Sequence, residues 1–321
     1  MASVCDDSAS ASASEHTVTL PSHDEVPPRA TPAQEVDVTV ELVAELLAGQ
    51  FPELAREPLT VGPSGWDNVM VRIGSSLAAR LPRRQLAADI SASELDWLPR
   101  VGRAWSFSAP VPVGVGDPAN GYPWRWAVVP WFEGRPEFEA QLSPDGVAEF
   151  GAALAEVHAP APAGSPLNPF RSQPLSARAE RLDARLETLS TIGGWVVETD
   201  AVRAAIEAAD PWQGCTWCHL DLHGNNVLTA HGHLAAIIDW GDSGLGDPAT
   251  DLGQAWYLLG SERFEAFADA YREAGGGADP SAPRVRAEAL AYAVTMASLE
   301  DEVYAASGWK ALRDLGVATA V

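Results

Sequence analysis

The two parts of the chain differ in how their apolar residues are spaced. A helix is predicted from about Val40, where apolar residues recur every three or four positions. Another is predicted at residues 91–98, with Ser91 as N-cap and Glu94 three residues later, as in a capping box. Runs rich in apolar and β-branched residues predict the strands of one small sheet at residues 59–61, 68–73, 77–81, 110–115 and 124–132.

A break at Gly134-Arg135-Pro136 separates this region from a mainly helical one. Helices are predicted at residues 143–158, 176–189, 200–209, 262–274 and 287–304. Between the third and fourth of these, two short apolar runs around a turn predict a β-hairpin. The pattern therefore predicts a β-rich lobe at residues 35–134 and a helical lobe at residues 135–321.

Residues 1–34 follow neither pattern. Alternating Ser and Ala, then an acidic, Pro-rich stretch, predict a disordered N-terminal tail. The tail has neither the basic start nor the apolar segment of a secretory signal, and the chain has no apolar run of 18 residues. We therefore expect a cytoplasmic protein that does not associate with membranes.

Composition changes this picture mainly through charge. The 321 residues are 46% hydrophobic and 20% charged, as in ordinary globular proteins, but 44 acids against 21 bases give a net charge of −23. Such a charge repels nucleic acids and anionic membranes. It favours a cationic small-molecule partner, although a general role in solubility explains it equally well.

The densest chemistry lies in and after the predicted hairpin. Asp221 and Asn226 are five positions apart in one loop, and Asp239 follows the apolar run that begins at Leu234. In phosphoryl transfer one carboxylate positions the attacking hydroxyl, while an Asn and a second Asp hold Mg²⁺ against the nucleotide phosphates. The spacing therefore indicates a kinase site.

Two neighbouring patterns offer metal or redox chemistry instead. Cys215 and Cys218 form a CxxC, but the extended pattern around them turns residues three apart to opposite faces. His219, Asp221 and His223 alternate on one strand face and supply three ligands that a metallohydrolase could use. Such an enzyme would leave Asn226 and Asp239 without a role.

From about residue 60 to residue 256 the chain resembles the aminoglycoside phosphotransferase family, small-molecule kinases related to protein kinases. Single motifs are weak, but their order and spacing are specific. The matching blocks are Gly65-Trp66-Asp67-Asn68, Arg80-Leu81-Pro82-Arg83, Glu94-x-x-Trp97-Leu98-Pro99, Gly121-Tyr122-Pro123-Trp124, Trp131-Phe132-Glu133-Gly134, the loop from His219 to Asn226, Ile238-Asp239-Trp240-Gly241 and Gly246-Asp247-Pro248-Ala249-x-Asp251-Leu252. The resemblance implies an α+β, protein-kinase-like fold with two lobes.

The resemblance also implies roles for individual residues. Asp221 would be the catalytic carboxylate, and Asn226 and Asp239 would bind Mg²⁺. Arg80 stands where protein kinases carry a lysine that meets the α- and β-phosphates, and Glu94 would be its ion-pair partner. Because a guanidinium is a broader fork than an ammonium, the contact with the phosphates would differ in shape.

Further family positions concern the nucleotide and the catalytic loop. The loop containing Ser64 would cover the phosphates with backbone amides, and the hinge backbone from Val129 to Trp131 would bind the base. Trp240, beside the metal-binding Asp, is a candidate for lining the nucleotide site. Leu220 stands where the family usually has Gly, which implies an ordinary backbone conformation at this position.

These observations predict a phosphotransferase that moves the γ-phosphate of Mg-ATP or Mg-GTP to a hydroxyl of a small molecule, such as an aminoglycoside or macrolide antibiotic. The C-terminal helices would form the acceptor pocket, where Glu300, Asp301 and Glu302 could meet amino groups or simply face solvent. The alternatives are a nucleotide-binding protein without transfer activity and the metallohydrolase. The intact set of Asp221, Asn226 and Asp239 argues against the first of these.

Overall fold

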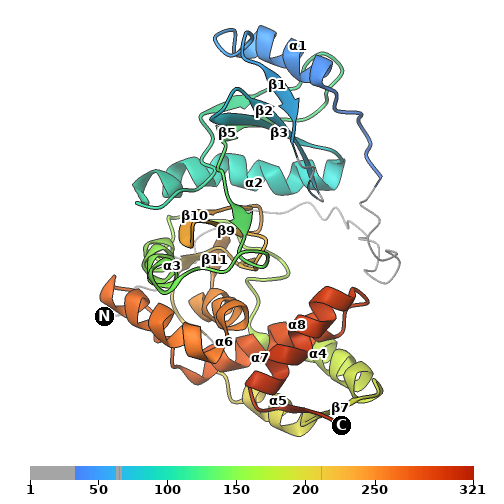
Figure 1. Ribbon diagram of the computed structural model, residues 1–321, viewed down its shortest axis with the longest axis vertical. Helices are drawn as coiled ribbons and strands as arrows, with labels where there is room; N and C mark the ends of the chain where they lie inside the picture. Colours follow the sequence, from blue (N-terminus) through green and yellow to red (C-terminus); the bar gives the residue numbers. More distant parts are fainter. Residues whose placement is uncertain (1–32, 63–64, 66, 211) are drawn as a thin grey trace.

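A computed structural model describes residues 33–62, 65, 67–210 and 212–321 of the protein. The predicted tail lies outside the described residues except for its last two positions, and so does Ser64. Figure 1 shows a lobe built around a sheet next to a lobe made mainly of helices. The predicted α+β fold with two lobes is therefore confirmed.

Five antiparallel strands form the sheet in the order β1-β2-β3-β5-β4. They are β1 (Leu59–Val61), β2 (Asn68–Ile73), β3 (Leu77–Pro82), β4 (Gly114–Gly116) and β5 (Trp126–Pro130). The first three predicted strands are confirmed almost residue for residue. The fourth is shorter than predicted, because Pro110 and Pro112 lack the N–H that a ladder needs.

The sheet lies between α1 (Val40–Gln50) and α2 (Gln85–Val101) in Figure 1. Side chains alternate across each strand, so the two faces carry different cores. The face towards α1 holds a large apolar cluster that includes Val71 and Trp126. The other face holds a small one, where Ala78 and Val129 pack with Leu95 of α2.

The start of α2 was not predicted correctly. The helix begins after Arg84 and is extended by a 3-10 turn, η2 (Gly102–Ala104). Ser91 is buried inside the helix instead of capping it, because the preceding Gln-Leu-Ala-Ala run is itself helix-forming. Glu94 does not complete a capping box, since its carboxylate pairs with Arg80.

The second lobe consists of six helices and small strand pairs within the described residues. The helices are α3 (Pro144–Val157), α4 (Leu175–Ser190), α5 (Thr199–Glu207), α6 (Pro248–Glu273), α7 (Pro283–Ala297) and α8 (Glu302–Asp314). The strands are β6 (Arg135–Pro136), β7 (Trp195–Val197), β8 (Thr216–Cys218), β9 (Val227–Ala230), β10 (His233–Ile237), β11 (Gly244–Gly246) and β12 (Ala318–Ala320). Within the regions described, no helix combines the length and apolar character needed to cross a bilayer.

The last two predicted helices differ from those observed. The one at residues 262–274 is the second part of α6, which continues through a kink at Gly260 (φ 73°). The one at residues 287–304 is two helices, because Asp301 interrupts it and caps α8 by accepting hydrogen bonds from the N–H groups of Val303 (2.9 Å) and Tyr304 (3.3 Å). The predicted hairpin is confirmed as β9 and β10.

A buried ion pair joins α4 to α7. Arg178 donates to Glu288, which also accepts a hydrogen bond from Thr250 (3.3 Å) at the start of α6. Burial raises the pKa of Glu288, and Arg178 opposes that rise. Removing one member of a buried pair leaves the other charge without compensation.

We expect Arg178→Ala to lower the free energy of unfolding by about 3 kcal/mol at pH 8. The loss should shrink at pH 5, because Glu288 binds a proton more readily in the folded than in the unfolded protein and then carries no charge. Urea denaturation at both pH values measures this. Arg203→Ala, which removes an exposed pair with Asp183, is the control and should have little effect at either pH. An equal loss for Arg178→Ala at pH 8 and pH 5 would contradict the expectation.

Candidate active site

The loop from His219 to Asn226 connects β8 to β9 and carries the predicted catalytic carboxylate. The side-chain amide of Asn226 donates to the backbone carbonyl of Asp221 (2.8 Å). The N–H of Ile238 donates to the carbonyl of Asn226 (2.8 Å), which ties this loop to the residue preceding Asp239. Asn226 is thus hydrogen-bonded to Asp221 and to the residue that precedes Asp239, which brings the backbone of the three predicted residues together.

Leu220 contradicts the expectation of an ordinary backbone conformation. Its φ is 68°, in the left-handed region that costs a non-glycine residue about 1 kcal/mol. Asp251 at the start of α6 offsets this cost by accepting from the N–H groups of His219 (2.7 Å) and Leu220 (2.7 Å). The Leu220 side chain is itself fully buried. The loop is thus held by a buried carboxylate and by packing, without the conformational freedom of glycine.

Asp239 follows β10 and also has a left-handed backbone (φ 64°), which Asp tolerates better than most residues. Its side chain is 56% exposed, whereas that of Asp221 is 18% exposed. One of its oxygens lies 3.5 Å from Nη2 of Arg80. Because more than half of the side chain is exposed, the carboxylate remains open to a ligand.

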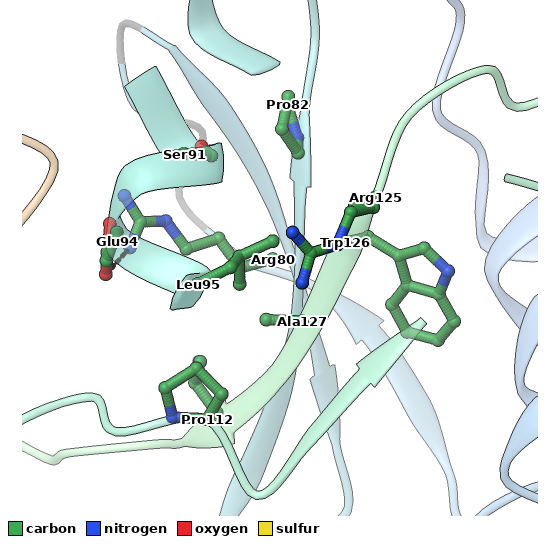
Figure 2. A pocket seen from close by; sticks show the side chains of 10 residues that line it. Arg80, Pro82, Ser91, Glu94, Leu95, Pro112, Arg125, Trp126 and Ala127 are labelled. Carbon is green, nitrogen blue, oxygen red and sulfur yellow. Dashed lines mark hydrogen bonds and ion pairs between the residues drawn. The ribbon is translucent and has the colours of Figure 1, made fainter. Parts of the chain in front are cut away.

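Arg80 brings the sheet lobe into contact with this hairpin. Figure 2 shows its side chain extending from β3 to Glu94 on α2, with which it forms a buried ion pair. Burial alone would lower the pKa of Arg80, but Glu94 and Asp239 more than offset this and raise it. Burial raises the pKa of Glu94, and Arg80 only partly opposes the rise. Arg80 thus stays cationic between two acids from different lobes.

Of the predicted hinge residues, Val129 lies beside this pair. Val129 is buried and lines a pocket together with Arg80, Glu94 and Leu95. The N–H of Trp131 donates to the carbonyl of Ser76 (2.8 Å) and is therefore not available to a nucleotide base. Contact of the hinge with a base stays a prediction. Ser64, which was predicted to cover the phosphates, lies outside the described part of the chain.

Trp240 does not line the site. Its ring is fully buried and packs against Trp105 and His219 with centroid distances of 4.5 Å each. Its Nε1 donates to the carbonyl of Ile237 (2.9 Å). The residue is part of the core beneath the catalytic loop.

The metal ligands proposed for a hydrolase are not brought together. Nε2 of His219 contacts the carbonyl of Ile238 (3.0 Å) and must donate to it, while Nδ1 accepts from the N–H of Asp221 (3.2 Å). Neither ring nitrogen is left for a metal. Across the described residues, the one His, Cys and acid cluster with ligand atoms within 4.8 Å is His158, Cys218 and Asp251.

That cluster is a hydrogen-bonded support and not a metal centre. Both ring nitrogens of His158 are engaged, Nδ1 with the hydroxyl of Tyr271 (2.8 Å) and Nε2 with Asp251 (3.1 Å). Burial raises the pKa of the Cys218 thiol, which disfavours the thiolate that zinc or redox chemistry needs. The geometry gives no support to a metal or redox role for Cys218.

Two residues that contact the loop from His219 to Asn226 were not predicted from the sequence. Arg171, from the connection between α3 and α4, forms an ion pair with Asp221 (2.9 Å). Tyr304 of α8 accepts a hydrogen bond from the side chain of Asn225 (2.9 Å), so α8 borders the loop that carries Asp221. Neither residue lies in a motif. Only the fold places them here.

Comparison with known proteins supplies a family and a fold. A family model described as the phosphotransferase enzyme family matches residues 59–288. No curated protein matches the chain by sequence. Among solved structures, the GDP complex of aminoglycoside 2'-phosphotransferase-IIIa has a TM-score of 0.62 at 18% identity, covering 85% of this chain and 97% of that one.

Two macrolide kinases are also similar. The apoenzyme of a macrolide 2'-phosphotransferase from Brachybacterium faecium has a TM-score of 0.57 at 20% identity, covering 85% of this chain and 98% of that one. A macrolide 2'-phosphotransferase of type I has a TM-score of 0.54 at 23% identity, with coverages of 85% and 97%. At these identities the similarity establishes the fold alone.

Proposed function

Because the chain belongs to the phosphotransferase enzyme family, we propose that it transfers the γ-phosphate of Mg-ATP or Mg-GTP to a hydroxyl group of a small molecule. The observation that carries the proposal is the position of Arg80. This cation is paired with Glu94 inside the sheet lobe and reaches to 3.5 Å from Asp239 of the other lobe. A cation beside an open carboxylate is the arrangement that a metal-bound triphosphate requires.

The donor atoms suit Mg²⁺. Asp239 offers an exposed carboxylate, and Asn226 uses its amide N–H group on Asp221, which leaves its side-chain oxygen for a ligand. Oxygen donors of this kind are those that Mg²⁺ prefers. When bound, Mg²⁺ would neutralise the charge on the phosphates and orient them. These two residues would hold it, and Arg80 would contact the phosphates directly.

Asp221 would align the acceptor hydroxyl and take up its proton. The acceptor oxygen forms the new bond to the γ-phosphorus, while the bond between that phosphorus and the β–γ bridging oxygen breaks and the nucleoside diphosphate leaves. Catalysis of this kind depends mainly on position and charge. The hydrogen bond that Asp251 accepts from the N–H of His219 and the one that Asn226 donates to the carbonyl of Asp221 would keep the loop in place during the reaction.

The acceptor would bind beside Asp221, against α8. Solved relatives include a complex of an aminoglycoside kinase with kanamycin and a macrolide kinase, and we propose an acceptor of one of these two classes. A cationic acceptor would meet Glu302, the first residue of α8, or Glu300, which precedes the helix cap Asp301. The carboxylate of Asp301 itself is used in capping α8. Tyr304, in the first turn of α8, would lie against the bound acceptor.

The test is release of nucleoside diphosphate from Mg-ATP and Mg-GTP with kanamycin, gentamicin, streptomycin and a macrolide, each with and without enzyme. We expect turnover that depends on the acceptor, together with an acceptor that gains one phosphoryl group by mass spectrometry. Nucleotide binding by calorimetry without any turnover would favour the non-catalytic alternative. Absence of nucleotide binding would overturn the proposal.

A further inference from the structure

A connection between α3 and α4 lies directly on the segment that follows Asp239. The carbonyl of Pro166 accepts from the N–H of Leu245 (2.9 Å), and the side-chain amide of Asn168 donates to the carboxylate of Asp242 (2.7 Å). A β-carbon added to Gly244 would lie 2.4 Å from the Pro166 carbonyl oxygen, so this approach requires glycine. The connection is therefore fixed against the predicted metal-binding segment.

The same connection has a defined turn that presents Arg171. The side-chain oxygen of Asn168 accepts from the N–H groups of Phe170 (2.9 Å) and Arg171 (3.0 Å). Ser172 accepts from the N–H of Asn168 (2.9 Å). One asparagine thus both closes the turn and attaches it to Asp242.

The guanidinium of Arg171 contacts three acceptors with three different nitrogens. Nη2 lies 2.9 Å from Oδ1 of Asp221, and Nε lies 3.1 Å from Oδ2 of Asp242. Nη1 donates to the carbonyl of Leu220 (3.3 Å), the residue with the left-handed backbone. A planar fork with several donors can make such a set of contacts, and a single ammonium cannot.

The charges around the site give this fork a second effect. Burial raises the pKa of Asp242, and Arg171 opposes the rise. Burial would lower the pKa of Arg171, but Asp221 and Asp242 reverse this and raise it. Arg171 thus stays cationic and compensates the negative charges of Asp221 on one loop and of Asp242 on the segment that follows Asp239.

The contacts also divide the two oxygens of Asp221. Oδ1 is bound by Arg171, whereas Oδ2 lies 3.8 Å from Nε2 of His223, beyond hydrogen-bond distance. A carboxylate held by one oxygen has a fixed orientation, and the second oxygen can then receive a substrate hydroxyl.

We propose that Arg171 is a positioning residue for phosphoryl transfer, which holds Oδ1 of Asp221 so that Oδ2 faces the acceptor hydroxyl and which ties the catalytic loop to the Asp239 segment through Asp242. The inference rests on the proposed function. A misplacement of about 1 Å of a catalytic group costs about 100-fold in rate. Loss of Arg171 should therefore act on kcat and not on nucleotide binding.

The experiment measures release of nucleoside diphosphate from Mg-ATP and Mg-GTP by wild type, Arg171→Ala and Arg171→Lys, with water, kanamycin or a macrolide as acceptor. For Arg171→Ala we expect kcat to fall about 100-fold while the nucleotide KM changes less than about threefold. Arg171→Lys should be intermediate, because it keeps the charge and loses the fork. Millimolar guanidinium ion should restore part of the activity of Arg171→Ala alone.

Arg181→Ala is the matched control, since it removes an exposed arginine from α4 without touching the site. It should keep wild-type rates and gain nothing from guanidinium. Wild-type kcat in Arg171→Ala would overturn the inference while leaving the proposed function intact. So would a loss of kcat that neither lysine nor guanidinium relieves and that comes with a lower urea midpoint, since this indicates a structural role. A wild-type enzyme with no turnover on water, kanamycin or the macrolide would instead count against the proposed function itself.

Discussion

Replacing Asp221 with asparagine is expected to lower kcat by about 10³-fold with little change in nucleotide affinity. Asparagine keeps an oxygen that can accept from Arg171, and it keeps the size of the side chain. It cannot take up the proton of the acceptor hydroxyl. Because the nucleotide-facing residues proposed here are Arg80, Asn226 and Asp239, binding of Mg-nucleotide should persist.

Steady-state kinetics and calorimetric titration with Mg-ATP and Mg-GTP measure these two properties separately. Asp200→Asn is a suitable control, because that carboxylate is 99% exposed on α5 and pairs with Arg203 of the same helix. A kcat for Asp221→Asn within about tenfold of wild type would show that Asp221 is not the catalytic carboxylate, since general bases contribute about 10² to 10⁴-fold.

The parts of the fold that could be predicted are those determined by local sequence. β2 alternates half-buried and buried residues along its whole length, and this alternation is visible in the sequence as a strand pattern. Ser143 precedes a proline and a helical run, and it caps α3 by accepting from the N–H of Gly146 (3.2 Å). Asp221, Asn226 and Asp239 are grouped because a single hairpin carries them. Their proximity needs no knowledge of the rest of the chain.

Features that depend on packing could not be predicted. Leu220 keeps its left-handed backbone because Asp251, on another element, accepts its N–H. Trp240 directly follows Asp239 in the sequence, but its ring is fully buried in the core. Arg171 belongs to an irregular connection without periodicity, so no pattern relates it to Asp221. The most informative contacts of the site are those between distant segments.

The left-handed backbone of Asp239 makes asparagine the right substitution for testing the metal site. Asn and Asp both adopt this conformation readily, whereas alanine at φ 64° would add backbone strain and confuse loss of stability with loss of function. Asp239→Asn removes the negative charge and leaves the shape. Arg80 keeps its buried partner Glu94, so the sheet lobe should be unaffected.

We expect Asp239→Asn to lower kcat/KM by at least about 10³-fold, equivalent to about 4 kcal/mol of transition-state stabilisation.

Thermal unfolding gives a second measurement that does not depend on the acceptor. Saturating nucleotide at about 100 times its dissociation constant stabilises a protein by about 2.7 kcal/mol. In wild type this stabilisation should depend on Mg²⁺ and be reduced by EDTA. In Asp239→Asn the stabilisation by nucleotide should be small, and it should be the same with Mg²⁺ as with EDTA. Because the proposed site pairs one carboxylate with the neutral oxygen of Asn226, removing that charge takes away the only anionic ligand assigned to the metal. Stabilisation by Mg-nucleotide equal to that of wild type would therefore contradict the assignment of Asp239.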